Sequence, residues 1–455
     1  MSSEVINLDS MNRRNDMDTS EFDLSQPRSG RVKEFFRFIC TKICVFLIIV
    51  GIISIVIVCV AFLVNYENDA EVTLTMDVLK EDLPAEQDVW FRKGLKDLEF
   101  ALNTHANKKR AQNVILFVAD GFHPDTMTAV RVHEYGSNGT FTWEHFPHLG
   151  LARWYKRNSV GTALFGGVGA NRGTSGVDSA VHPNDCTATI VDTNHVESIL
   201  SLALGSDLGT GFITNGDIRD GTPAALYAHV VNDSWTCPEM LPDQIDEPFT
   251  CLDTETQLMG YIPGNELNVI VGWNALGASC DSSLLTTFWK DADCFIAADM
   301  SDFSKVTVNT KHIRALFPES LRTEISLHEV VIKSTQILSN AHDGFLLVVV
   351  CKPVSENNED DILELDKTVR LTMNSLRDSL NETLIIVVSS PFSDKKQTIS
   401  EEETIDTAIH ATGPMAHLFH KVHDPTYVAH VISYAARLGR FRDSVLASSF
   451  LQWFS

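Results

Sequence analysis

The chain has 455 residues, enough for one large α/β domain or two smaller ones, and its apolar fraction of 44% is ordinary for a globular protein. Its formal net charge is -24. An acidic excess of this size repels nucleic acid and anionic lipid, so the composition excludes both as partners of the bulk of the chain.

An uncharged apolar run at residues 43–64 is long enough to cross a bilayer as a helix. Basic residues precede it and acidic residues follow, which predicts a cytoplasmic N-terminus. A cleaved signal peptide is the alternative, but its apolar core is shorter and begins nearer the first residue. We therefore predict a single-pass type II membrane protein, with a cytoplasmic tail at 1–42, a stalk at 65–85 and a lumenal or extracellular domain at 86–455.

Residues after the apolar run carry the marks of a secreted domain. Three N-glycosylation sequons lie there, at Asn138, Asn232 and Asn381. Six of the nine cysteines lie there too, and an oxidising compartment permits them to form disulfides. Because they are near neighbours in sequence, we expect Cys237 to pair with Cys251 and Cys280 with Cys294.

The rest of the chain alternates between helical and strand patterns. Apolar residues at helical spacing predict an amphipathic helix with the stripe Phe91, Leu95, Leu98 and Leu102. Buried strands are predicted at 113–121, 209–215, 267–272, 344–350 and 382–388. Helical patterns at 326–340 and 426–438 alternate with them. This alternation indicates an α/β fold with a mostly parallel central sheet and helices on both faces.

Two strand ends carry oxygen ligands. Asp120 follows the first strand, although an Asp-Gly pair after a strand is more often a turn than a ligand. Asp220 and Thr222 follow the second strand, ahead of a short helix. Ligands of this kind on adjacent loops suit a hard cation such as magnesium. The alternative for Thr222 is a helix cap, with Pro223 at the first helical position.

Five separated blocks resemble the alkaline phosphatase family, in the same order: "NVILFVADGF", "DGTPAALYAHVVN", "SLHEVVIKSTQILS" with "GFLLVVV", "NETLIIVV" and "GPMAHLFHKVHDPTYVAHVISYAA". The resemblance covers residues 86–438. It implies an alkaline-phosphatase-like fold and a phosphomonoesterase with two zinc ions, one magnesium ion, an attacking serine and a phosphate-clamping arginine. Asp120, Asp220 and Thr222 match metal-site residues of the family.

Most other positions of the family's site carry different residues. Ligand positions for zinc and magnesium align with side chains of the wrong type: Val350, Ser355, Glu359, Ser390, Pro391 and Glu402. The clamping arginine aligns with Asp233, whose neighbour Asn232 suggests an exposed, glycosylated loop. We therefore expect no zinc, and at most one loosely held magnesium or calcium ion. We also expect the carboxylates of Asp120, Asp220 and Asp233 to repel phosphate.

The attacking serine is the hardest position to align. The family pattern Asp-Ser-Ala-x-x-Ala-Thr matches "PNDCTAT" at 183–189 without gaps and places Asn184 at the serine position. An amide is not a nucleophile of this kind. A shifted register would bring Cys186 forward, and an insertion would allow Ser179 to serve. The family's crown insertion also shortens, to residues 393–411.

These substitutions favour a catalytically silent, membrane-anchored ectodomain that acts by binding. The resemblance implies pairing through a surface that includes the N-terminal helix, so we expect a homodimer or a heterodimer with an active relative. The alternatives are an active or weak metal-dependent phosphomonoesterase with a reorganised site, and a purely structural surface glycoprotein.

Overall fold

The computed structural model describes residues 29–68, 83–156, 158–242, 251–275, 279–307, 309–341, 343–354, 358–391 and 404–442. The chain divides into two compact units, Met1–Asn103 and Thr104–Ser455. The first unit therefore includes the amphipathic helix that the sequence suggested as the start of the second. Whether the functional domain begins at residue 86 remains a prediction.

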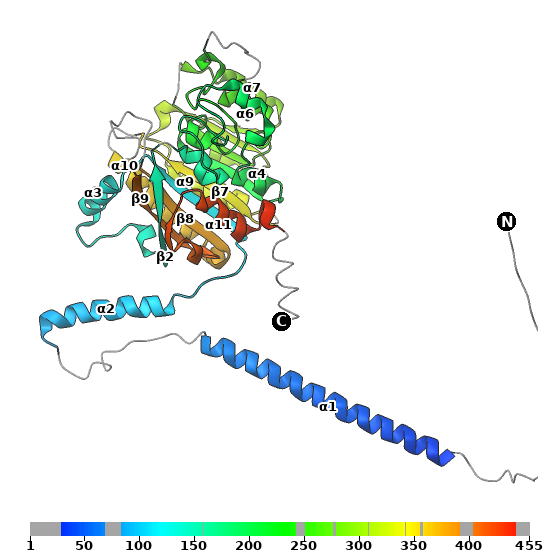
Figure 1. Ribbon diagram of the computed structural model, residues 1–455. Coiled ribbons are helices and arrows are strands. Elements are labelled where there is room, and N and C mark those ends of the chain that lie inside the picture. The colour runs from blue at the N-terminus through cyan, green and yellow to red at the C-terminus, as the bar shows by residue number, and fades with distance from the viewer. Residues whose placement is uncertain are drawn as a thin grey trace, which may run out of the picture. The chain divides into compact units, whose positions relative to one another are not determined.

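The first unit contains two long helices, α1 (Ser29–Asn68) and α2 (Ala85–Asn103) (Figure 1). The apolar part of α1 runs over Thr41–Ala61, 21 residues with a mean hydropathy of 3.5, which is enough to span a bilayer. Helix α2 contains the predicted apolar stripe, and none of its side chains is buried. Phe91, Leu98 and Leu102 are each about half exposed.

The second unit is built on a ten-stranded sheet in the order β10-β2-β9-β8-β1-β7-β3-β4-β6-β5. The seven strands from β8 to β5 run parallel to one another, and β9 is antiparallel to both β8 and β2. The strand bounds are β1 Asn113–Asp120, β2 His148–Tyr155, β3 Gly209–Asp217, β4 Val269–Asn274, β5 Phe295–Ala297, β6 Ile313–Pro318, β7 Phe345–Cys351, β8 Thr383–Ser390, β9 Thr404–Thr412 and β10 Lys421–His423. The mostly parallel α/β fold is confirmed, as are all five predicted strands.

Helices cover both faces of the sheet (Figure 1). Alternate side chains of the central strands point to opposite layers: Leu116 of β1 packs in one apolar cluster and Phe117 in the other. The first cluster includes residues of α4 (Ile199–Leu204), α5 (Gly221–Ala224), α6 (Thr254–Gly260), α7 (Ser283–Asp291) and α11 (Tyr427–Ala436). The second includes residues of α3 (Pro124–Tyr135), α8 (Met300–Lys305), α9 (Leu327–Leu338) and α10 (Asn358–Ser375).

The sequence did not predict several strands, among them β2 and β9. The alternating pattern of β2 leaves Leu149 and Leu151 partly exposed, so it lacks the continuous apolar run of the central strands. Strand β9 lies within the segment expected to be a shortened crown, and its described residues pair with β8 and β2 instead. The remainder of that segment, residues 393–403, lies outside the described part of the chain.

The two disulfides differ from the expected pairs. Cys186 bonds to Cys251, and Cys237 bonds to Cys280. Cys294 is a free, half-buried cysteine. The expectation of bonds between sequence neighbours was wrong because the fold brings distant segments together: the two bridges close loops of 65 and 43 residues.

Candidate functional site

A pocket of about 500 Å³ opens at the carboxyl ends of the parallel strands. Asp120 ends β1, Ala275 follows β4 and Lys352 follows β7, and all three line the pocket. Asp220, three residues beyond β3, lines it too. Ligands bind at this edge in parallel α/β folds, so the sheet places these side chains where chemistry is expected.

The three oxygen-bearing residues that the sequence singled out do lie together in this pocket. Asp120 is 6% exposed and Thr222 is 7% exposed. Asp220 occupies the N-cap position of α5, and Thr222 and Pro223 both lie inside that helix. The alternative in which Thr222 caps the helix is therefore wrong. Its exclusion leaves Thr222 as a buried pocket residue.

A lysine lies against the two carboxylates. Lys352 Nζ is 3.2 Å from Asp220 Oδ2 and 3.8 Å from Asp120 Oδ2. The Lys352 side chain is 13% exposed and that of Asp120 is 7% exposed, so this contact is sheltered from solvent. The sequence reasoning passed over Lys352, because its position had no assigned role in the family pattern.

The strand ends that would supply the remaining metal ligands do not do so. Val350 is fully buried in the apolar cluster beneath α11, and Ser390 and Pro391 are buried at the end of β8. Glu359 lies on α10 and contacts His133 Nδ1 at 2.5 Å. Burial raises the pKa of the nearby Cys351 thiol well above its usual range, so this thiol is not a reactive thiolate.

Two further ligand positions, Ser355 and Glu402, lie outside the described residues. Among the residues that the structure does describe, the pocket offers no histidine, and Asp233 and Glu319 are its only carboxylates besides Asp120 and Asp220. Zinc prefers nitrogen and sulfur ligands in a tetrahedral arrangement. The donor set of this pocket therefore does not fit a pair of zinc ions.

A serine that the sequence reasoning missed also lines the pocket. Ser159 is 7% exposed, and its Oγ lies 3.1 Å from Thr162 Oγ1. Residues 158–164, "NSVGTAL", fit the pattern Asp-Ser-Ala-x-x-Ala-Thr at its serine and its second alanine, Ala163. The sequence therefore contains a partial match that includes Ser159, but the gapless match at residues 183–189 was preferred for the serine position.

The three residues first considered for the nucleophile position do not line the pocket. Asn184 Oδ1 accepts a hydrogen bond from the Asn232 amide at 2.7 Å. Ser179 is exposed in a turn. Cys186 forms a disulfide and has no free thiol, so its assignment as an alternative nucleophile is wrong.

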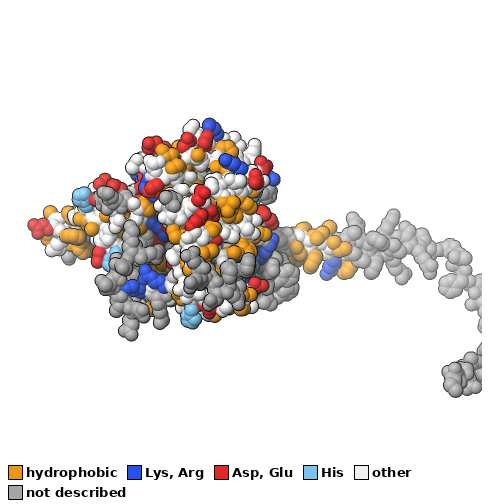
Figure 2. Space-filling view, turned by 90° about the horizontal axis from the view of Figure 1, so that it is seen from above, with side chains coloured by type: hydrophobic (Ala, Val, Ile, Leu, Met, Phe, Trp, Pro, Cys, Tyr) orange, Lys and Arg blue, Asp and Glu red, His pale blue; other side chains and the backbone are white. Residues whose placement is uncertain are grey.

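The charge of the pocket also differs from expectation. Asp233 lines it, as expected from the family's arginine position, and its side chain lies against Gly221. The four carboxylates of the lining are matched by four cationic side chains: Lys156, Arg172, Arg322 and Lys352. Arg322 donates to Glu319 at 2.6 Å. The expectation that the carboxylates of Asp120, Asp220 and Asp233 repel phosphate counted only the aligned residues and left these cations out. Outside the pocket, acidic and basic side chains are interspersed on the face seen in Figure 2.

The sequons differ in accessibility. Asn138 and Asn381 are exposed. Asn232 is half-buried, and its amide nitrogen donates to Asn184, while its Oδ1 accepts from Ser234. A glycan on Asn232 would have to displace the first of these bonds, so this loop is less open than the sequence suggested.

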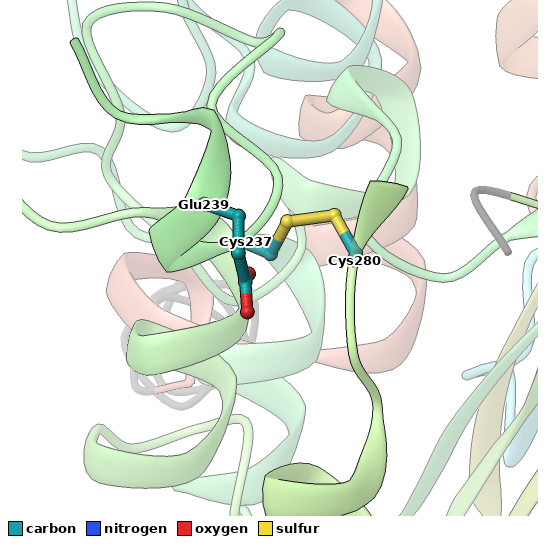
Figure 3. Close-up of side chains that lie close together, drawn as sticks. All are labelled: Cys237, Glu239 and Cys280. Atoms are coloured by element: carbon teal, nitrogen blue, oxygen red, sulfur yellow. A yellow bond between two sulfur atoms is a disulfide. The ribbon is translucent and has the colours of Figure 1, made fainter. Parts of the chain in front are cut away.

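One other group of side chains has the composition of a metal site. Cys237, Glu239 and Cys280 bring their ligand atoms within 4.8 Å of one another (Figure 3). The two sulfur atoms are bonded to each other, so neither is a thiolate able to bind a metal. Within the described residues this is the only cluster of three such ligands that close together, and its role is that of a disulfide.

Comparison with known proteins agrees with the fold. A family model described as alkaline phosphatase matches residues 111–275. The membrane-bound alkaline phosphatase of Bombyx mori is 25% identical over 360 residues, which cover 67% of this chain and 65% of that protein. The human tissue-nonspecific alkaline phosphatase is 26% identical over 471 residues, covering 77% of this chain and 88% of that protein.

Solved structures show the same fold. An alkaline phosphatase from the psychrophile Shewanella sp. has a TM-score of 0.56 at 14% identity, covering 71% of this chain and 99% of that chain. The alkaline phosphatase of the Antarctic bacterium TAB5 has a TM-score of 0.53 at 17% identity, covering 72% and 99%. The fold is thus that of the alkaline phosphatases. In sequence, the chain is similar to alkaline phosphatases over residues 111–275 and to the relatives named above.

Proposed function

We propose that this chain is a membrane-anchored member of the alkaline phosphatase family that does not catalyse zinc-dependent phosphomonoester hydrolysis and acts by binding. The observation that carries the proposal is the chemistry of the strand ends. Strands β7 and β8 end in Val350, Cys351, Ser389 and Ser390, none of which supplies a carboxylate or imidazole ligand. A phosphomonoesterase of this family needs such ligands to concentrate positive charge where the phosphate dianion binds.

We expect the full-length chain, purified in detergent and supplied with zinc and magnesium, to hydrolyse p-nitrophenyl phosphate at the background rate from neutral to alkaline pH. The expected cause is the missing zinc ligand set. An active alkaline phosphatase carried through the same detergent and buffers is the control. Turnover that a chelator abolishes, and that remains proportional to the amount of this chain through purification, would contradict the proposal.

A weak hydrolase is the second candidate, and the position of Ser159 favours it. This serine lies in the pocket with Asp120, Asp220 and Arg172, where a nucleophile and an anion-binding cation are needed. The same assay separates the two candidates when the Ser159→Ala variant is added. Turnover by the unsubstituted chain that Ser159→Ala removes would establish the hydrolase and identify its nucleophile.

The membrane topology and the partner follow from the first unit. The long apolar helix α1 supports a membrane anchor, and the flanking charges favour a cytoplasmic N-terminus with the phosphatase-like unit on the lumenal or extracellular side. Within its own unit, α2 leaves its apolar side chains exposed, and this supports a pairing surface, since an apolar stripe of this length is stable in water only when it is covered. We therefore propose a homodimer or a heterodimer with an active relative.

Substitution of the α2 stripe is expected to separate the dimer. Leu95→Asp with Leu98→Asp places two charges on the stripe, and we expect the mass of the purified full-length chain in detergent to fall from dimer to monomer in size-exclusion chromatography with light scattering. The control is Lys96→Asp, which changes charge on the same helix without altering the stripe. A monomeric unsubstituted chain, together with no phosphatase recovered alongside it from its own cells, would contradict the pairing proposal.

A further inference from the structure

We propose that the Lys352 ammonium is the built-in cation of Asp120 and Asp220, and that it takes the place of the magnesium ion that the family resemblance assigns to these two carboxylates. The inference rests on the proposed loss of the family's metal chemistry. Its test measures cation binding and not turnover, so that either proposal is able to fail alone.

The first argument is the position of the ammonium group. Nζ lies within 3.2 Å of one carboxylate and 3.8 Å of the other, so one positive charge faces both anions. A magnesium ion bound to either oxygen at about 2.0–2.1 Å would sit next to this ammonium. Two cations held that close in a sheltered site repel each other strongly. The lysine and the metal therefore exclude one another.

The second argument is that the backbone of Lys352 is held in place. The Asn215 side chain, on β3, accepts from the Lys352 backbone N–H at 2.7 Å and donates to its carbonyl at 2.9 Å. Asn215 is itself 7% exposed, and its main-chain carbonyl accepts from Arg322. These two hydrogen bonds hold the Lys352 backbone in place and so limit where its side chain can reach. The contact with the carboxylates therefore differs from that of a mobile surface lysine.

The third argument is the room made for the lysine stem. Gly216 lies beneath it: a Cβ added there would come to 3.5 Å from Lys352 Cδ and 3.2 Å from Asp220 Oδ2. Even an alanine at residue 216 would therefore be in van der Waals contact with the lysine stem and tight against the carboxylate. Asn215, Gly216 and Lys352 thus form one positioning unit that delivers the ammonium to Asp120 and Asp220.

The test compares cation binding by the full-length chain in detergent with that of Lys352→Ala. Mn²⁺ binding followed by electron paramagnetic resonance, and the Mg²⁺ dependence of thermal unfolding, are both measured. The unsubstituted chain is expected to show no Mg²⁺-dependent rise in melting temperature. Lys352→Ala removes the ammonium that faces the two carboxylates, so we expect the variant to melt lower without Mg²⁺ and to recover on adding it. We also expect it to bind one Mn²⁺ at least about tenfold more tightly than the unsubstituted chain.

Two controls assign the effect to this pocket. Lys305→Ala removes an exposed lysine whose Nζ lies 2.8 Å from Asp302, and it should gain no Mn²⁺ site. Adding Asp120→Asn to Lys352→Ala should abolish the gained site. Mn²⁺ binding by the unsubstituted chain that Asp120→Asn removes would overturn the proposal. So would a folded Lys352→Ala chain without cation dependence. If Lys352→Ala does not fold, the unsubstituted chain and its Asp120→Asn variant still decide the question.

Discussion

Replacing Arg219 with methionine is expected to lower the free energy of unfolding of the phosphatase-like unit by about 3–5 kcal/mol, because it leaves two buried carboxylates without their cation. Arg219 is fully buried, and Asp217 and Glu255 are each 1% exposed. Its guanidinium donates two hydrogen bonds to Asp217, at 2.8 and 2.9 Å, and one to Glu255 at 2.6 Å. Methionine fills much of the same space and provides none of these bonds.

The expected loss depends on pH with a definite sign. Burial raises the pKa of Glu255, even though Arg219 opposes the shift. In the variant the Glu255 carboxyl group loses the cation that opposes this rise, so its pKa rises further and the deficit should shrink as the pH falls into the acid range. Chemical unfolding followed by tryptophan fluorescence at several pH values measures this change.

Arg153→Met is the matched control for this substitution. Arg153 also makes two hydrogen bonds to one aspartate, Asp406, at 2.9 and 3.0 Å. Those two side chains are 47% and 35% exposed, so their removal should cost at most about 1 kcal/mol. Equal losses in the two variants would show that burial of the Arg219 network does not determine its contribution.

Removing the bond between Cys186 and Cys251 should have an effect of similar size. The bridge closes a loop of 65 residues, and the chain-entropy relation gives about 4 kcal/mol for a loop of that length. The small apolar cluster around it contains only Val177, Val181, Val231, Trp235 and Cys251 as buried members. A core of this size contributes little by itself, so we expect Cys186→Ala with Cys251→Ala to loosen this region.

The measurement is the unfolding midpoint of the double variant, beside Cys294→Ala as the control. Cys294 is free, so its substitution should leave the midpoint nearly unchanged. Peptide mapping without reduction should recover the pairs 186–251 and 237–280. Recovery of a peptide joining Cys237 to Cys251 would contradict the connectivity described here.

The central strands were predictable because their side chains pack against helices on both faces of the sheet, which requires a continuous apolar run in the sequence. A run such as Leu384–Val388 is buried on both faces, and only a central parallel strand has that environment. Strands β2 and β9 could not be found in the same way. Their pairing is antiparallel and distant in sequence, and their apolar residues alternate with polar ones, a pattern that is weak over eight or nine residues.

The site residues were predictable only where the family motif directly adjoins a predicted strand. Asp120, Asp220 and Thr222 lie at or just after the ends of strands that the sequence predicts, so their position in one pocket was predictable. Ser159 lies in the irregular segment between β2 and the short helical segment that begins at residue 160, and β2 itself was not predicted. Lys352 was not predicted for a different reason. An alignment identifies only the residues at known ligand positions, and Lys352 extends into the site from a position that has no ligand role in the family.

Lys352 is present from the moment the chain is synthesised, whereas a divalent ion has to be captured from the surrounding compartment. A positive charge therefore faces Asp120 and Asp220 as soon as β1, β3 and β7 come together. Metal-dependent folds tie their maturation to ion supply and are sensitive to chelators. With its cation built into the polypeptide, this pocket is expected to assemble independently of how much magnesium or zinc the surrounding compartment delivers.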